Sequence, residues 1–139
     1  MKYSDLQVWQ KAIDLVTEIY GLTANFPADE RFGLVSQVRR AAVSIPANIA
    51  EGHGRKSTNA FLNHLSIANG SLMELETHLQ ISLRLGFVSE KNIAAILPKT
   101  DEIGKMISGL RNSLSYQAKE PNPDPDALNP ESSILNRVR

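Results

Sequence analysis

Cysteine is absent from the chain of 139 residues. Its absence excludes disulfide bonds, thiolate metal sites and cysteine nucleophiles. An excess of charge of one sign is also missing, because fifteen Lys and Arg residues balance fifteen Asp and Glu residues. A neutral chain is not drawn as a whole to nucleic acid or to an anionic membrane, so any such binding has to come from a local cluster of cations.

The N-terminal segment contains no long apolar run. Its first fifteen residues, MKYSDLQVWQKAIDL, carry charged and polar side chains throughout. We therefore expect neither a signal peptide nor a membrane span, and we predict a soluble cytoplasmic protein without a membrane partner. What the chain does contain is 42% hydrophobic residues, an ordinary content for one globular domain with a hydrophobic core.

Apolar residues recur every three or four positions through about the first 115 residues, which is the period of a helix with one buried face. This pattern predicts helices over about 5–23, 29–51 and 57–86, and a fourth helix from about 89. Short connections favour an all-α, up-down-up-down antiparallel four-helix bundle over residues 1–118. Residues 119–139 contain four prolines and no apolar period, so we predict a disordered tail there.

Each predicted helix has one apolar stripe that we expect to face the core. The four stripes are Leu6, Trp9, Ile13, Val16 and Tyr20; Leu34, Val38, Ala42, Ile45 and Ile49; Phe61, Leu65, Ala68, Leu72, Leu75 and Leu79; and Ile93, Ile96, Thr100, Ile103, Ile107, Leu110 and Leu114. This assignment places Trp9 and Tyr20 in the core rather than in base stacking. Pro46 and Pro98 fall inside helices, which we expect them to kink without breaking.

The first two predicted helices carry more apolar residues than one stripe requires. The additional residues are Val8, Ala12, Leu15, Ile19 and Leu22 on the first helix, and Val43, Ala47 and Ala50 on the second. This surplus predicts either a wide core or a subunit interface, and the residues alone leave both open. In the second case, the candidate interface residues are Leu15, Ile19, Leu22, Val43 and Ala47.

No pattern in the chain predicts catalysis or a metal site. The nearest approach to a metal site is Glu74 and His78, four residues apart on the third helix, with His64 on nearly the same face. Such a pair is typical of an exposed side-chain contact, and no other helix offers matching carboxylates. No serine lies in a Gly-x-Ser-x-Gly turn. We therefore predict a protein that is not an enzyme and that has no cofactor.

Arg39 and Arg40 form one cluster of cations, with Arg39 on a flank of the second helix and Arg40 on its outer face. A guanidinium fork binds a phosphate or a carboxylate of a neighbouring subunit equally well. Arg55 and Lys56 form a second cluster, at the start of the third helix. There they predict either a phosphate contact or a plain connecting turn capped by Ser57.

Residues 29–56 hold five cations against three acids. This small local excess predicts nucleic-acid binding that is modest and strongly dependent on salt.

Three runs of residues resemble a known family. They are DLQVWQKA at 5–12, FP at 26–27 and QVRRAAVSIPANIAEG at 37–52. The resemblance covers about residues 3–118 and is to the bacterial four-helix bundle proteins encoded within intervening sequences of 23S ribosomal RNA genes, which are often labelled ribosomal proteins. It implies an up-down bundle that assembles into a ring of five subunits. Arg39, Arg40 and Arg55 match the family motif.

Two hypotheses of function follow. A similar group, the accessory proteins of diversity-generating retroelements, suggests nucleic-acid binding, so the first hypothesis is a homo-oligomer, a homopentamer by resemblance, that binds RNA or DNA through Arg39, Arg40, Arg55 and Lys56. The alternative is an oligomeric scaffold that binds another protein, in which Arg39 and Arg40 bridge to carboxylates within or between subunits.

Overall fold

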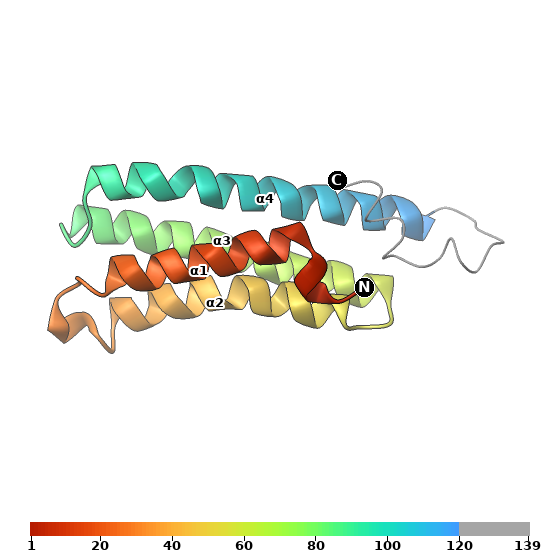
Figure 1. Cartoon of the computed structure of the whole chain (residues 1–139), viewed down its shortest axis with the longest axis horizontal. Helices are drawn as coiled ribbons and strands as arrows, with labels where there is room; N and C mark the ends of the chain where they lie inside the picture. Colours follow the sequence, from red (N-terminus) through yellow and green to blue (C-terminus); the bar gives the residue numbers. More distant parts are fainter. Residues whose placement is uncertain (120–139) are drawn as a thin grey trace.

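The computed structural model describes residues 1–119, and every regular element in this part of the chain is a helix (Figure 1). The α-helices are α1 (Gln7–Thr23), α2 (Leu34–His53), α3 (Thr58–Arg84) and α4 (Glu90–Lys119), and two short 3-10 turns, η1 (Tyr3–Asp5) and η2 (Ala28–Glu30), precede α1 and α2. The predicted all-α fold is confirmed. The disordered tail predicted for residues 119–139 lies, beyond Lys119, outside the described residues.

The four helices form an up-down-up-down bundle. α1 packs against α2 and α4, and α3 packs against the same two helices. Figure 1 shows that consecutive helices run in opposite directions, because each short connection returns the chain along its neighbour. None of the helices in residues 1–119 combines the length and the apolar character that crossing a bilayer requires.

The ends of α3 agree with the prediction. The Ser57 Oγ accepts a hydrogen bond from the Ala60 amide at 3.3 Å, as an N-cap does. At the other end, Gly86 has a φ of +79°, a left-handed conformation that glycine adopts without strain.

The start of α2 differs from the prediction. The helix begins at Leu34 instead of residue 29, because Gly33 departs from helical geometry with φ −102° and ψ −109°. The Glu30 carboxylate accepts a hydrogen bond from the Leu34 amide at 3.1 Å and so caps the new helix. Arg31 and Phe32 therefore lie in a connection and not in a helix.

The core positions predicted on α3 and α4 are all buried. Thr100, the polar member of the set, donates its hydroxyl to the Leu97 carbonyl at 2.9 Å and so is satisfied. Both α2 and α4 continue through their internal prolines, as predicted. The bend at each proline stays a prediction.

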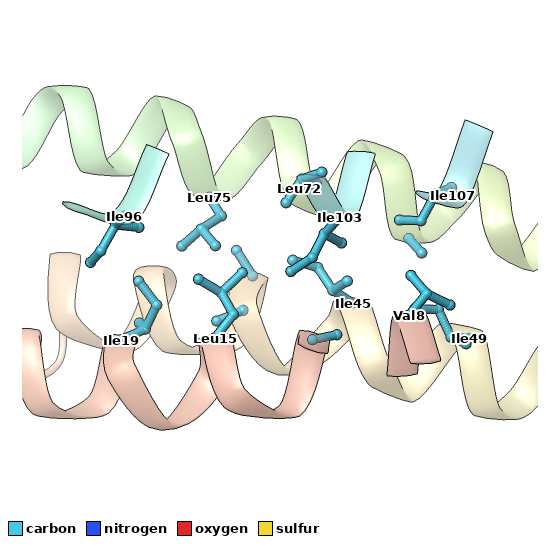
Figure 2. Packing of buried hydrophobic residues seen from close by; sticks show 14 of the residues in the cluster. Val8, Leu15, Ile19, Ile45, Ile49, Leu72, Leu75, Ile96, Ile103 and Ile107 are labelled. Atoms are coloured by element: carbon cyan, nitrogen blue, oxygen red, sulfur yellow. The ribbon is translucent and has the colours of Figure 1, made fainter. Parts of the chain in front are cut away.

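The rotation of α1 corrects the prediction for that helix. Its buried residues are Val8, Ala12, Leu15, Ile19 and Thr23, most of which belong to the stripe regarded as surplus. Figure 2 shows Leu15 and Ile19 among core side chains from the other helices. Of the stripe predicted to face the core, only Leu6 is buried. Ile13 and Tyr20 are 37% and 43% exposed, and Trp9 and Val16 are half-buried.

The cause of this difference is the pair of neighbours that α1 has in the bundle. Its two apolar stripes both repeat with the helical period and lie about 100° apart around the helix axis. The period alone therefore does not decide which stripe faces the core. On the flank towards α4, Lys11 pairs with Glu102 at 3.1 Å, and Glu18 pairs with Lys99. These ion pairs accompany a rotation in which Leu15 enters the core and Tyr20 lies on the side of α2.

Candidate nucleic-acid interface

Arg39 connects α2 to the end of α1. Its Nε donates a hydrogen bond to the Thr23 Oγ1 at 2.8 Å, and its Nη2 donates to the Tyr20 carbonyl at 3.4 Å. The guanidinium also lies over the Tyr20 ring, 4.4 Å from the ring centroid. Arg39 is half-buried, so it is on a flank as predicted, but its partners are a hydroxyl, a carbonyl and a ring instead of a carboxylate.

Arg40 is exposed on the outer face of α2, as predicted. Its guanidinium forms no hydrogen bond or ion pair with any described residue. All five donors of its planar fork are therefore available to a ligand such as a phosphate group.

A hollow of about 650 Å³ lies at this end of the bundle. We call it the arginine hollow, and its lining consists of Tyr20, Arg31, Phe32, Val35, Ser36, Arg39, Arg40, Val43 and Ser44. Three of these residues are arginines and none is a carboxylate. The arrangement concentrates positive charge in a concave surface, which favours an anionic ligand.

Arg55 and Lys56 lie at the opposite end of α2. The part of α2 from Arg40 to its end at His53 spans about 20 Å, so the structure does not bring the four predicted cations into one patch. Arg55 pairs with Glu51 at 2.9 Å, whereas Lys56 is exposed and has no partner among the described residues. Ser57 caps α3, as the connecting-turn interpretation predicts.

Arg31 and Phe32 are the site residues that the sequence analysis missed. The Phe32 side chain is 87% exposed, and the Arg31 guanidinium lies 5.4 Å from its ring centroid. The prediction of one helix over residues 29–51 placed both in regular structure, where neither had an evident role. A signal was present, because Phe32 does not belong to the stripe that begins at Leu34.

Two of the five candidate interface residues are unavailable to a second subunit. Leu15 and Ile19 are 1% and 0% exposed within the single chain, because the rotation of α1 places them in the core. Leu22 is half-buried and packs against the core. Val43 is 42% exposed and Ala47 is also exposed, so these two remain on the surface.

The exposed apolar side chains of α1 and those of α2 come from two helices that pack against each other. Ile13 and Tyr20 are about two helical turns apart on α1, and Tyr20 and Val43 line the same hollow. We call Ile13, Tyr20, Val43 and Ala47 the assembly face. It combines the stripe that the sequence analysis placed in the core with the surplus residues of α2.

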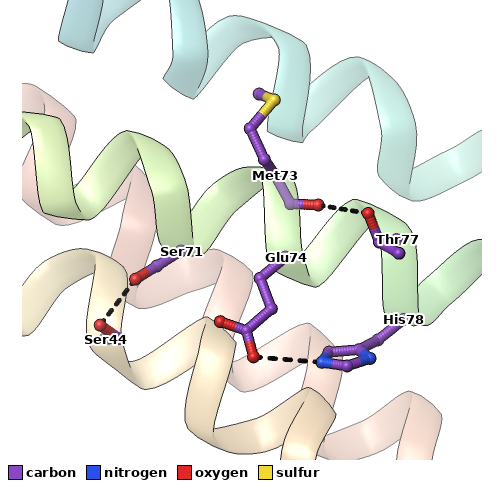
Figure 3. A network of polar contacts seen from close by, with 6 residues as sticks. All are labelled: Ser44, Ser71, Met73, Glu74, Thr77 and His78. Atoms are coloured by element: carbon purple, nitrogen blue, oxygen red, sulfur yellow. Dashed lines mark hydrogen bonds and ion pairs between the residues drawn. The ribbon is translucent and has the colours of Figure 1, made fainter.

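The histidines of α3 take part in side-chain contacts. His78 Nε2 lies 3.2 Å from the Glu74 Oε1, so the predicted side-chain contact is present, but the His78 side chain is only 14% exposed. The Ser44 and Ser71 hydroxyls meet at 2.8 Å nearby (Figure 3). His64 contacts the Asn48 side chain at 3.1 Å. Within residues 1–119, no three His, Asp or Glu side chains come together as a metal site.

Comparison with known proteins identifies relatives of the same fold. Residues 4–109 match the family described as 23S rRNA-intervening sequence protein. A solved structure with 27% sequence identity and a TM-score of 0.65 is a protein of unknown function from the S23 ribosomal protein family of Bacteroides thetaiotaomicron. The likeness covers 72% of this chain and 94% of that one. No curated protein matches the chain.

Neither description names an enzymatic activity. The family match covers well over half of the chain and includes the run of residues 37–52 that carries the resemblance. The chain therefore belongs to the family of 23S rRNA-intervening sequence proteins.

Proposed function

We propose that the protein is a cytoplasmic, non-enzymatic homo-oligomer that binds nucleic acid. The observation that carries the binding is the arginine hollow, which has three arginines and no carboxylate in its lining. A neutral chain needs such a local concentration of cations to attract phosphate. Membership of the family supports this proposal only through the link of that family to ribosomal RNA genes.

The cations differ in what they contribute. Arg39 is engaged with Thr23 and Tyr20, so its main role is to hold the hollow together. Arg40 and Lys56 have no partner among the described residues, and Arg31 has only a ring contact. Phosphate contacts therefore come from Arg31 and Arg40 in the hollow, with Lys56 as a separate contact further along the surface.

The assembly rests on a second observation, the assembly face. Its large side chains are 37% to 43% exposed, although the bundle already encloses a complete core. Covering such a face with a second copy removes apolar surface from water. We propose a ring of five subunits, the number that the family resemblance implies. Tyr20 and Val43 also line the arginine hollow, so the hollow then opens beside a subunit boundary.

The alternative function is an oligomeric scaffold for another protein. The engagement of Arg39 within the chain favours it, because one of the arginines of the family motif then serves the fold. The two functions differ in their dependence on Arg40. A phosphate contact predicts weaker binding in the Arg40→Ala variant at unchanged mass, whereas an ion pair between subunits predicts a smaller assembly.

Binding of the full chain to structured ribosomal RNA fragments and to unrelated RNA tests the proposal. With about three phosphate contacts, affinity falls about 20- to 40-fold between about 50 and 200 mM salt. Arg40→Ala and Lys56→Ala each weaken binding and reduce the salt dependence. Arg84→Ala is the matched control, because it removes an exposed arginine of α3 outside the hollow. Absence of binding at about 50 mM salt contradicts the nucleic-acid function.

A further inference from the structure

The arginine hollow contains an aromatic ring whose position the fold does not explain. Phe32 is 87% exposed, the highest exposure among the large hydrophobic side chains of residues 1–119. A ring that leaves so much of its surface in water contributes little to the stability of the chain. Its exposure is therefore better explained by a ligand than by packing.

The surroundings of Phe32 select the kind of ligand. The Arg31 guanidinium lies over one face of the ring, 5.4 Å from its centre, so a ligand would use the other face. Arg40, whose guanidinium has no partner among the described residues, lines the same hollow. Ser36, also in the lining, has a hydroxyl without a hydrogen-bond partner among the described residues. A flat apolar face next to two cations and a hydroxyl matches a nucleotide, which combines a base, a phosphate and a sugar.

The strandedness of the ligand follows from the same geometry. Bases in a duplex stack on each other, so their faces are closed to a side chain, and a duplex offers the hollow only its phosphates. An unpaired base has an open face that stacks on an aromatic ring. Phe has no polar group on its ring, so it distinguishes unpaired from paired bases without selecting among the four bases.

We propose that the arginine hollow binds unpaired nucleotides of a single-stranded nucleic acid, with a base stacked on Phe32 and the flanking phosphates held by Arg31 and Arg40. This inference rests on the proposed nucleic-acid function and names its ligand class. It also assigns a role to Arg31 and Phe32, which lie outside the three runs of residues that resemble the family.

Fluorescence anisotropy with the full chain tests the proposal. The probes are labelled oligo-U and oligo-dT of about 12 nucleotides and a duplex of the same length, at about 50 mM salt. We expect both single strands to bind at least about 10-fold more tightly than the duplex. The ratio of oligo-U to oligo-dT affinity separates RNA from DNA as the source of the strand.

Substitutions of Phe32 separate stacking from charge. Phe32→Ala weakens single-strand binding about 10-fold and leaves duplex binding unchanged, and Phe32→Trp retains single-strand binding because it keeps an aromatic face. Leu85→Ala is the matched control, since Leu85 is 56% exposed and lies outside the hollow. All three variants should keep the circular dichroism spectrum and melting temperature of the wild type, because these side chains are largely exposed.

The outcomes distinguish the two proposals. If no nucleic acid binds at low salt, the proposed function fails, and this inference fails with it. If the duplex binds as tightly as the single strands, or if Phe32→Ala binds oligo-U like the wild type, the single-strand inference is wrong, although the nucleic-acid function stands.

Discussion

Gly52 is a residue at which α2 and α3 approach each other closely. It is buried in the last turn of α2, just before the C-cap Gly54. A Cβ atom at this position would lie 2.6 Å from the His64 Cβ and 3.0 Å from the Phe61 Cδ1. The absence of a side chain at Gly52 therefore allows the two helices to approach.

Replacement of Gly52 by alanine should therefore destabilise the bundle. We expect Gly52→Ala to lower the free energy of unfolding by about 1–3 kcal/mol, because the added methyl group forces α2 and α3 apart. Gly70→Ala is the control, since a Cβ there meets nothing within 4 Å. In the interior of α3, that substitution should stabilise by about 1 kcal/mol. Urea unfolding measures both, and a stabilising effect at Gly52 would contradict the close approach.

Arg39 offers a second prediction at the residue scale. Arg39→Ala removes two hydrogen bonds and a ring contact between α1 and α2, so it should destabilise by about 1–2 kcal/mol. Arg39→Lys should restore little of this, because an ammonium group lacks the planar fork. Arg40→Ala should change the stability by less than about 0.5 kcal/mol, because Arg40 has no partner within residues 1–119. Thermal unfolding of the three variants measures these differences, and equal losses for Arg39→Ala and Arg40→Ala would refute the structural role.

At the scale of elements, the rotation of α1 decides which residues serve the core and which serve the surface. Its two apolar stripes have the same period, but only the one with Leu15 and Ile19 faces the other helices. The stripe with Ile13 and Tyr20 is exposed, and Tyr20 contacts Arg39 of α2. A surface available for assembly is the consequence.

This rotation predicts unequal effects of alanine in the two stripes. Leu15→Ala should destabilise by about 2–5 kcal/mol, because Leu15 is 1% exposed and leaves a cavity in the core. Ile13→Ala should cost less than about 1 kcal/mol, because Ile13 is 37% exposed. Chemical denaturation at one protein concentration compares them. A larger loss of stability in Ile13→Ala than in Leu15→Ala would contradict this rotation of α1 and support the one predicted from the sequence.

At the scale of the whole molecule, the assembly face and the arginine hollow meet. Tyr20 and Val43 belong to both, so the proposed assembly and the proposed binding concern one side of the bundle. The four-helix core by itself needs neither feature, because all of its buried positions are filled within the chain. The proposed function and the proposed assembly are therefore most directly tested by substitutions on these two surfaces.

Light scattering of the purified protein tests the assembly. We expect the wild type to have the mass of the proposed five-subunit ring, and Val43→Glu to reduce this mass by placing a charge in an apolar interface. Ile67→Glu is the control, since Ile67 is 44% exposed on α3, outside the assembly face. A wild type with the mass of one chain would refute the assembly, and equal effects of the two substitutions would place the interface elsewhere.

The sequence determined the number and approximate limits of the helices, and it determined the core faces of α3 and α4. These properties depend on the period of apolar residues along one helix and on local capping groups such as Ser57 and Gly86. The exposed position of Arg40 was predictable for the same reason. Family membership also followed from local runs of residues.

Only the tertiary structure decided which stripe of α1 is buried, what Arg39 contacts and which residues form the arginine hollow. Tyr20 and Arg40 are twenty positions apart, and they line one hollow only because α1 and α2 pack side by side. Periodicity is a property of each helix alone. The rotation of a helix with two equivalent stripes depends on its neighbours, so the surface left for function is settled only when the bundle has assembled.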